Sequence, residues 1–232
     1  VRNGGRTCRV VGIANGAGMI HPNMATMIAV LMTDALIEPQ PLSQMLRKAV
    51  DKSFHRITVD GDTSTNDSVF ALASGAAGAF PNDALQSAFE SVSRELAKKI
   101  LRDAEGATKL IHVKVNGAAT QADALQVAQT IASSLLVRTS IAGGDPNWGR
   151  ILAAAGRSGV AIDPQKFSLR VNDLLVFADG APSSTPESRI AAEYQKSEIV
   201  LDIDLGLGGA SDEFMTCDLT EQYVRINADY TT

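Results

Sequence analysis

Cysteine, histidine and aromatic residues are scarce in this 232-residue sequence. It contains two cysteines, Cys8 and Cys217, three histidines, His21, His55 and His112, and a single tryptophan. The cysteines are too few and too distant for a disulfide framework, and the histidines lack the spacing of metal ligands. We therefore expect neither a disulfide-stabilised fold nor a metal centre.

Long hydrophobic runs and an excess of basic residues are also absent. No stretch approaches the roughly 18 uninterrupted apolar residues that span a bilayer, and the N-terminus lacks the pattern of a secretion signal. Lys and Arg number 21 against 26 Asp and Glu, which gives a formal net charge of −5. This charge disfavours a nucleic-acid partner, because phosphate backbones attract basic surfaces. We expect a soluble, intracellular protein with no membrane partner.

Apolar residues make up 45% of the chain, enough for a buried core in one or two domains. Strand-like and helix-like patterns alternate without repeats, which predicts a mixed α/β or α+β fold. Strands are predicted at 9–14, 26–33, 109–115, 167–177 (a hairpin), 198–205 and 214–226, and helices at 42–54, 82–101 and 120–137. The strand at 26–33 is rich in non-polar side chains, so we expect it to be central and buried on both faces. A boundary near 102–108 predicts two lobes.

The first segment that could carry chemistry is GIANGAGMIHPNMAT, from Gly12 to Thr26. Its glycines permit close backbone approach, although an ordinary glycine-rich connection also explains them, and the phosphate-loop pattern is absent. A threonine hydroxyl becomes a useful nucleophile when a base takes its proton, and the α-amine of an N-terminal threonine can be that base. Thr26 would act in this way only as a chain terminus.

Two further segments combine acids, hydroxyls and glycines. Residues 58–67 (TVDGDTSTND) are interpreted either as a turn with Asx and Ser/Thr caps, or as a site that organises backbone donors or a phosphate. No basic residue lies within this segment to support an anion. Residues 145–150 (DPNWGR) are typical of a helix start, capped by Asp145 or Asn147, with Trp148 buried.

The chain resembles one enzyme family in five separated blocks. The family is the bifunctional ornithine acetyltransferase / glutamate N-acetyltransferase family of arginine biosynthesis, and the resemblance runs from about Val11 to Thr232. The blocks are NGAGMIHPNMATMIAVLMTDA, FHRITVDGDTSTND, DAEGATK, GGDPNWGRILAA and QYVRINADYTT. Five blocks in the family's order are far more specific than any single motif.

The resemblance implies a precursor that cuts itself between Ala25 and Thr26. The Thr26 hydroxyl would attack the Ala25 carbonyl, and water would hydrolyse the resulting ester. The freed Thr26 would then take acetyl from N-acetylornithine and pass it to glutamate. Residues 1–25 would be the tail of an α chain, most of which is absent along with its oxyanion-hole groups, and the start at Val1 rather than Met agrees with this. Residues 26–104 would form a first lobe, and 105–232 a C-terminal α/β lobe.

The resemblance also implies a set of substrate-binding residues: Asn15, Thr26, Glu105, Asn227 and Thr232. The Glu105 carboxylate suits the ammonium groups of ornithine. Alternatively, Glu105 is an ordinary acidic turn residue before a glycine. Asn15 stands where the family carries Lys. Its amide offers a hydrogen bond but no positive charge, which puts the binding of a substrate carboxylate in doubt.

The fold that the resemblance implies is a layered α/β sandwich, superficially like N-terminal-nucleophile hydrolases, with a sheet-rich C-terminal lobe. No cofactor or metal is implied, and acetyl-CoA would be an additional donor only in bifunctional members. The absent α chain would be an obligate partner, in an α/β heterodimer that pairs further into a heterotetramer. The expected location is the cytoplasm, or the mitochondrial matrix in a eukaryote.

Two other functions stay open at this point. One is an N-terminal-nucleophile amidohydrolase in which water replaces glutamate as the acyl acceptor. The other is a catalytically inactive paralogue, which Asn15 and the missing α-chain portion both suggest.

Overall fold

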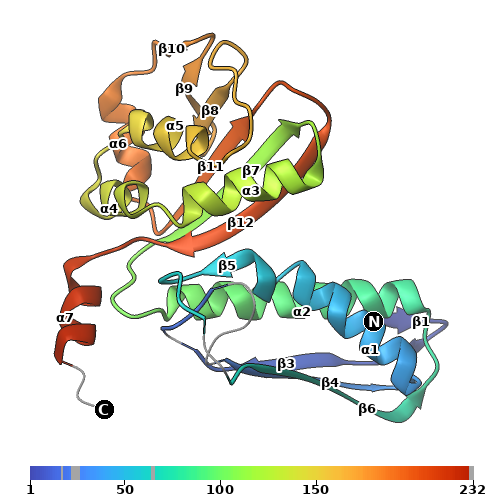
Figure 1. Cartoon of the computed structure of the whole chain (residues 1–232). Coiled ribbons are helices and arrows are strands. Elements are labelled where there is room, and N and C mark those ends of the chain that lie inside the picture. Colours follow the sequence, from blue (N-terminus) through green and yellow to red (C-terminus); the bar gives the residue numbers. More distant parts are fainter. Residues whose placement is uncertain (17, 22–26, 64–65, 230–232) are drawn as a thin grey trace. The chain divides into compact units, whose positions relative to one another are not determined.

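The computed structural model describes residues 1–16, 18–21, 27–63 and 66–229. The chain divides into two compact units, Val1–Ala104 and Glu105–Thr232. The division falls within the stretch 102–108. Each unit contains both helices and strands (Figure 1).

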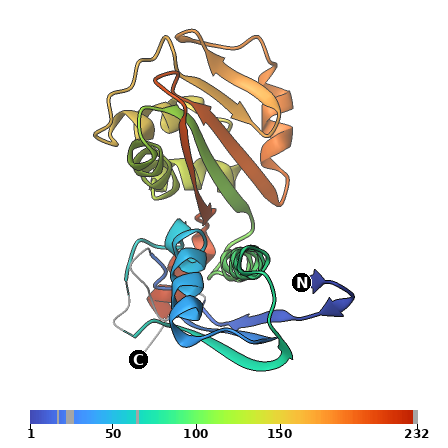
Figure 2. The same ribbon diagram turned by 90° about the vertical axis from the view of Figure 1, so that its right-hand side faces the viewer.

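The first unit is built on a sheet with the order β3-β4-β6, in which β4 pairs antiparallel with β3 and parallel with β6. Helices α1 and α2 lie on the same side of this sheet in both views (Figure 1 and Figure 2). The elements of this unit are β1 (Arg2–Asn3), β2 (Arg6–Thr7), β3 (Val10–Ala14), β4 (Ile28–Ala35), α1 (Pro39–Asp51), the 3-10 turn Phe54–Arg56, β5 (Ile57–Thr58), β6 (Ser68–Gly78) and α2 (Asn82–Arg102).

The apolar strand β4 is central, as expected, but it is buried on one face only. Ala29, Leu31 and Ala35 are buried, whereas the alternate residue Ile28 is 53% exposed. The expectation of burial on both faces is therefore wrong for the described residues, since α1 and α2 cover a single face of the sheet.

Helix α2 packs closely on this sheet because β3 carries a glycine at the contact. A Cβ placed on Gly12 would lie 2.7 Å from Cδ1 of Leu96, inside ordinary contact distance. The buried face of α2 includes Leu85, Phe89 and Ile100, at the three- and four-residue spacing that predicted this helix. The helix predicted at 42–54 is observed as α1. This helix begins at Pro39, a position where proline is favoured.

The second unit has the strand order β10-β9-β8-β11-β7-β12, with β11 parallel to β7 and the other pairs antiparallel. Helix α3 lies along β7 and β12 (Figure 1 and Figure 2). The elements are β7 (Leu110–Ala118), α3 (Gln121–Ala132), α4 (Leu135–Gly143), α5 (Trp148–Gly156), β8 (Ser168–Val171), β9 (Leu174–Ala178), β10 (Ala181–Pro182), α6 (Glu187–Tyr194), β11 (Glu198–Asp204), β12 (Ala210–Cys217) and α7 (Glu221–Asp229).

The single helix predicted at 120–137 is two helices. Helix α3 ends at Ala132, and Ser134 begins α4 as its N-cap, where its side chain accepts a hydrogen bond from the Val137 N–H. A serine that caps a new helix competes with continuation of the old one.

The strand predicted at 214–226 is also two elements. Strand β12 ends at Cys217 and helix α7 begins at Glu221. Within α7, Glu221 and Arg225 form an ion pair one helical turn apart, with 3.5 Å between Arg225 Nη2 and Glu221 Oε1. The strand was predicted from the alternation of apolar and polar residues over 214–226, but this alternation ends with β12, and α7 has no buried residue.

Candidate functional site

The expected site residues are only partly described. Ala25, Thr26 and Thr232 lie outside the described residues. Asn15 lies in the first unit, and Glu105 and Asn227 lie in the second.

Glu105 and Asn227 are in direct contact within the second unit. The Asn227 side-chain amide donates a hydrogen bond of 2.8 Å to Glu105 Oε2, and another of 3.0 Å to the Tyr223 carbonyl. Two residues far apart in the sequence thus present a carboxylate and an amide side by side at an accessible surface. A carboxylate there can accept hydrogen bonds from a ligand ammonium group.

The loop that carries Glu105 is fixed against the start of α7. Gly106 has φ +70°, and a Cβ there would lie 2.6 Å from the Tyr223 backbone nitrogen, so only glycine fits this approach. The Thr220 hydroxyl donates to the Gly106 carbonyl at 2.7 Å. The buried Asp218 accepts from the Thr108 N–H at 2.8 Å. These bonds position Glu105 relative to the helix that carries Asn227.

Asn15 extends the pairing of β3 with β4. Its side-chain oxygen accepts from the Ile28 N–H at 2.8 Å, and its own N–H donates to the Ile28 carbonyl at 3.1 Å. Asn15 also lines a cavity of about 240 Å³ with Lys99 and Asp103. Lys99 brings a cation to the neighbourhood of Asn15, which the sequence pattern did not reveal because Lys99 belongs to a different element.

The acidic loop 58–67 holds the chain upstream of the Ala25–Thr26 bond. Asp60 accepts from the Met19 N–H at 2.6 Å and from the Ile20 N–H at 3.0 Å. The Thr58 hydroxyl donates to the Ile20 carbonyl at 2.9 Å, and its oxygen lies 3.0 Å from Nδ1 of His21. Burial lowers the pKa of His21 below its ordinary value, and the nearby acids oppose this shift.

The same loop holds the chain on the other side of that bond. Asp67 Oδ1 accepts from the Met27 N–H at 2.7 Å, and the Ser68 N–H donates to the Met27 carbonyl at 3.0 Å. Asp67 Oδ2 is buried and has no hydrogen-bond partner among the described residues. Burial raises the pKa of Asp67, and the Met27 hydrogen bond opposes this rise. Of the interpretations of this loop, the described residues favour organisation of backbone donors.

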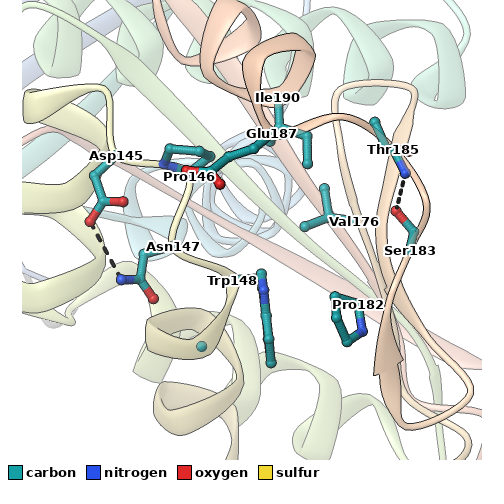
Figure 3. A pocket seen from close by; sticks show the side chains of 11 residues that line it. Asp145, Pro146, Asn147, Trp148, Val176, Pro182, Ser183, Thr185, Glu187 and Ile190 are labelled. Carbon is teal, nitrogen blue, oxygen red and sulfur yellow. Dashed lines mark hydrogen bonds between the residues drawn. The ribbon is translucent and has the colours of Figure 1, made fainter.

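The DPNWGR segment begins a helix, as predicted, with Asn147 as the cap. The Asn147 side chain accepts from the Arg150 N–H at 3.3 Å. Trp148 is only partly buried, because it forms one wall of a cavity of about 430 Å³. Figure 3 shows Trp148 and Pro182 facing each other across this space. The Trp148 ring stacks on Phe177 at 4.9 Å between centroids. The expectation that Trp148 is buried is therefore wrong.

No group of three or more potential metal ligands occurs among the residues that the structure describes. In the same part of the chain, no helix is both long and apolar enough to cross a membrane.

Comparison with protein-family models decides the affiliation. The model of the ArgJ family matches residues 1–232. The chain belongs to the ArgJ family. The resemblance seen in the five sequence blocks is thereby confirmed.

Curated relatives agree with this assignment. The chain is 46% identical to "Arginine biosynthesis bifunctional protein ArgJ" of a Synechococcus species, over 99% of this chain and 59% of that protein. It is also 46% identical to "Glutamate N-acetyltransferase" of Methanocaldococcus jannaschii, over 98% of this chain and 60% of that protein. The chain therefore spans somewhat more than half the length of these ArgJ-family relatives.

A solved structure supports the fold. The crystal structure of the arginine biosynthesis bifunctional protein ArgJ from Bacillus halodurans superposes with a TM-score of 0.81 at 38% identity, and the match covers 85% of this chain and 96% of that chain. The mixed α/β class expected from the sequence is confirmed, and the chain has the ArgJ fold.

Proposed function

We propose that this chain belongs to an acetyltransferase that moves acetyl from N-acetylornithine to glutamate through an ester on Thr26. The strongest support is the ArgJ family match over residues 1–232, together with relatives named for arginine biosynthesis and for glutamate N-acetyl transfer. The neighbouring Glu105 and Asn227 side chains add support, because a carboxylate beside an amide suits a substrate that carries ammonium groups.

The nucleophile would be made by self-cleavage. The Thr26 hydroxyl attacks the Ala25 carbonyl, the acyl group moves from nitrogen to oxygen, and the Thr26 nitrogen takes up a proton. Water then hydrolyses the ester, which leaves a carboxylate on Ala25 and a free hydroxyl beside a free α-amine on Thr26. An amine in this position can act as the base for its own hydroxyl.

Acetyl transfer would then proceed in two half-reactions. The α-amine takes the Thr26 hydroxyl proton as the oxygen bonds to the acetyl carbon of N-acetylornithine. The amide C–N bond breaks, and the proton passes to the departing ornithine amine. The glutamate amine next attacks the ester, and the proton that it loses returns to the Thr26 oxygen as N-acetylglutamate leaves. A covalent acetyl-enzyme predicts ping-pong kinetics.

The open face of the sheet in the first unit supports an obligate protein partner. Val11, Ile13, Phe70 and Leu72 are each at least half exposed on the face away from α1 and α2. The strands β4 and β6 are parallel, and parallel strand pairs usually lie in sheets that are covered on both faces, although β3 makes this sheet a mixed one. An apolar patch of this kind marks an interaction surface.

The part of the family protein that lies outside this chain is the proposed partner at that face. The curated relatives are longer than this chain by roughly two fifths of their own length, which is enough for a covering layer. We propose an α/β heterodimer that pairs further, as expected from the sequence. In the full-length protein, Phe70→Asp should lower the thermal midpoint, because a charge then lies in the covered face, whereas the equally polar change Leu135→Asp, at an exposed leucine of α4, should not. An unchanged thermal midpoint after Phe70→Asp would contradict this partner assignment.

The reaction would need no cofactor, with acetyl-CoA as a second acetyl donor if the protein is bifunctional. The proposed location is the cytoplasm, or the mitochondrial matrix in a eukaryote; a relative from Schizosaccharomyces japonicus is named as mitochondrial.

The central experiment uses the full-length protein, labelled N-acetylornithine and glutamate. Mass spectrometry should find cleavage at Ala25–Thr26, an acetyl group on Thr26, and glutamate-dependent N-acetylglutamate formation. Thr26→Ala should abolish all three, and Thr26→Ser should retain measurable cleavage. Cleavage of the Thr26→Ala protein would refute the scheme. Acetate release without glutamate would favour the amidohydrolase, and a wild-type protein that never acetylates would favour the inactive paralogue.

A further inference from the structure

The cavity at the DPNWGR segment is large enough for a small molecule. Its volume is about 430 Å³, which lies within the range of ordinary ligand sites. The walls come from three parts of the second unit: residues 145–149, strand β9, and the chain from β10 into α6. Neither Glu105 nor Asn227, the described residues of the proposed substrate site in this unit, lines the cavity. The proposed acetyl transfer therefore gives this cavity no role.

One wall of the cavity is a flat aromatic ring. The half-buried Trp148 ring stacks on Phe177, with 4.9 Å between the ring centroids. Pro182 faces Trp148 across the cavity (Figure 3), and it pairs with Phe177 in the antiparallel register of β10 and β9. Both walls are thus anchored to the same pair of strands. A slot between an indole ring and a proline suits a flat group, and the face of an indole ring attracts a cation.

The charged side chains that line the cavity are both acidic, Asp145 and Glu187. The Glu187 carboxylate has no hydrogen bond or ion pair with the described residues. Asp145 Oδ2 accepts from the Asn147 amide at 3.4 Å and lies 3.8 Å from Arg150 Nη2. Arg150 also donates to the Leu136 carbonyl at 2.9 Å, so this guanidinium is only partly engaged with Asp145. The charge of the wall favours a cationic ligand and disfavours a phosphate or a carboxylate.

The hydroxyl groups of the cavity wall are available only as acceptors. Ser183 and Thr185 each donate their hydroxyl proton to the Leu175 carbonyl, both at 2.7 Å. The Asn147 side chain is also occupied, because its amide donates to Asp145 and its oxygen accepts from the Arg150 N–H. A ligand that fits this wall therefore carries N–H or O–H donors rather than acceptors.

We propose that this cavity binds the guanidinium group of a small molecule, with the flat cation between Trp148 and Pro182. Its N–H groups donate to the Glu187 carboxylate and to the hydroxyl oxygens of Ser183 and Thr185. A guanidinium fits better than an ammonium group, because it is planar, stacks on aromatic faces and offers a fork of donors to a carboxylate. The inference goes beyond the proposed function and uses only residues of the second unit.

Isothermal titration calorimetry of the full-length protein tests the ligand class with three probes that share one butyl stem. Butylguanidine should bind with a Kd in the millimolar range that so small a ligand allows. Butylamine should bind at least about threefold more weakly, and butyrate should not bind. If butylguanidine does not bind, or binds no more tightly than butyrate, the site is refuted. If butylamine binds as tightly as butylguanidine, the assignment to a guanidinium group is wrong.

Two variants locate the binding of butylguanidine. Glu187 is exposed in the first turn of α6, so Glu187→Gln should fold normally and weaken binding about fivefold. Trp148→Ala should weaken binding by about the same factor. If Trp148→Ala does not fold, Glu187→Gln alone decides, and binding equal to that of wild type would overturn the inference.

A matched control separates local contact from overall charge. Asp173 is an exposed acid of the same unit and does not line the cavity. Asp173→Asn removes the same charge as Glu187→Gln and should bind butylguanidine as wild type does. Equal weakening by Asp173→Asn and Glu187→Gln would show that net charge, and not this cavity, attracts the cation.

Discussion

Replacement of Gly106 by alanine should damage substrate binding more than it damages stability. Gly106 has φ +70°, and a Cβ there would lie 2.6 Å from the Tyr223 nitrogen. The left-handed conformation costs a non-glycine residue about 1–2 kcal/mol. The contact is roughly 1 Å closer than ordinary packing allows, and its atoms belong to the backbone, so the helix has to move.

Helix α7 can move at little cost, because none of its residues is buried. A shift of roughly 1 Å would lengthen the 2.8 Å bond between Glu105 and Asn227 beyond useful range. We therefore expect Gly106→Ala in the full-length protein to raise KM for N-acetylornithine about 10-fold, the equivalent of one good hydrogen bond. Tm should fall by about 2–6 °C from the backbone strain.

Gly159→Ala separates the strain from the collision. Gly159 has φ +84°, but no atom lies within 4 Å of the position of its Cβ. The control should lower Tm by a similar amount, since the strain is the same, and leave KM unchanged. Steady-state kinetics and thermal unfolding of both variants check this. If KM is the same for Gly106→Ala and Gly159→Ala, the approach of the loop to α7 does not position the substrate site.

Three further variants test other parts of the structure. Arg138 is 2% exposed and donates to the Cys217 carbonyl at 2.7 Å, so Arg138→Ala should lower the free energy of unfolding by about 3 kcal/mol in a denaturant titration. Asn15→Lys removes the acceptor for the Ile28 N–H and should destabilise by about 1 kcal/mol, whereas Asn15→Asp should retain stability. The pKa of His21 is lowered, so folding favours its neutral form; the stability this gives is present above about pH 6.5 and is lost as pH falls through the folded-state pKa. The unfolding free energy should therefore drop more between pH 7.5 and 5 in wild type than in His21→Asn.

The elements that the sequence predicted well are those whose burial follows a local period. Helix α2 repeats apolar residues every three or four positions, and β11 alternates over its length, so both were predictable. Prediction failed where a local cap or a surface helix overrode the period, as at Ser134 and in α7. The one-sided burial of β4 could not be predicted from the sequence either. An apolar strand has the same sequence pattern whether its second face is covered by the same chain or by another.

The residues of the candidate site were selected by family resemblance rather than by local pattern, and their role stays a prediction. Nothing in DAEGATK or in the C-terminal stretch indicates that Glu105 and Asn227 meet. Their contact depends on Gly106 and on the Thr220 bond to its carbonyl, which together fix the loop against α7. Tertiary contacts of this kind carry no sequence period.

The acidic loop shows why residue type can mislead even where the segment is correctly singled out. The absence of a basic residue near Asp60 and Asp67 argued against an anion site, and it left these carboxylates without an evident partner. Backbone N–H groups fill that role: those of Met19, Ile20 and Met27 donate to the two acids. If the chain is cut between Ala25 and Thr26, as we propose, these hydrogen bonds keep both flanks anchored, because none of them depends on the bond that breaks. The carboxylates are therefore best understood as acceptors for the backbone N–H groups of the chain itself.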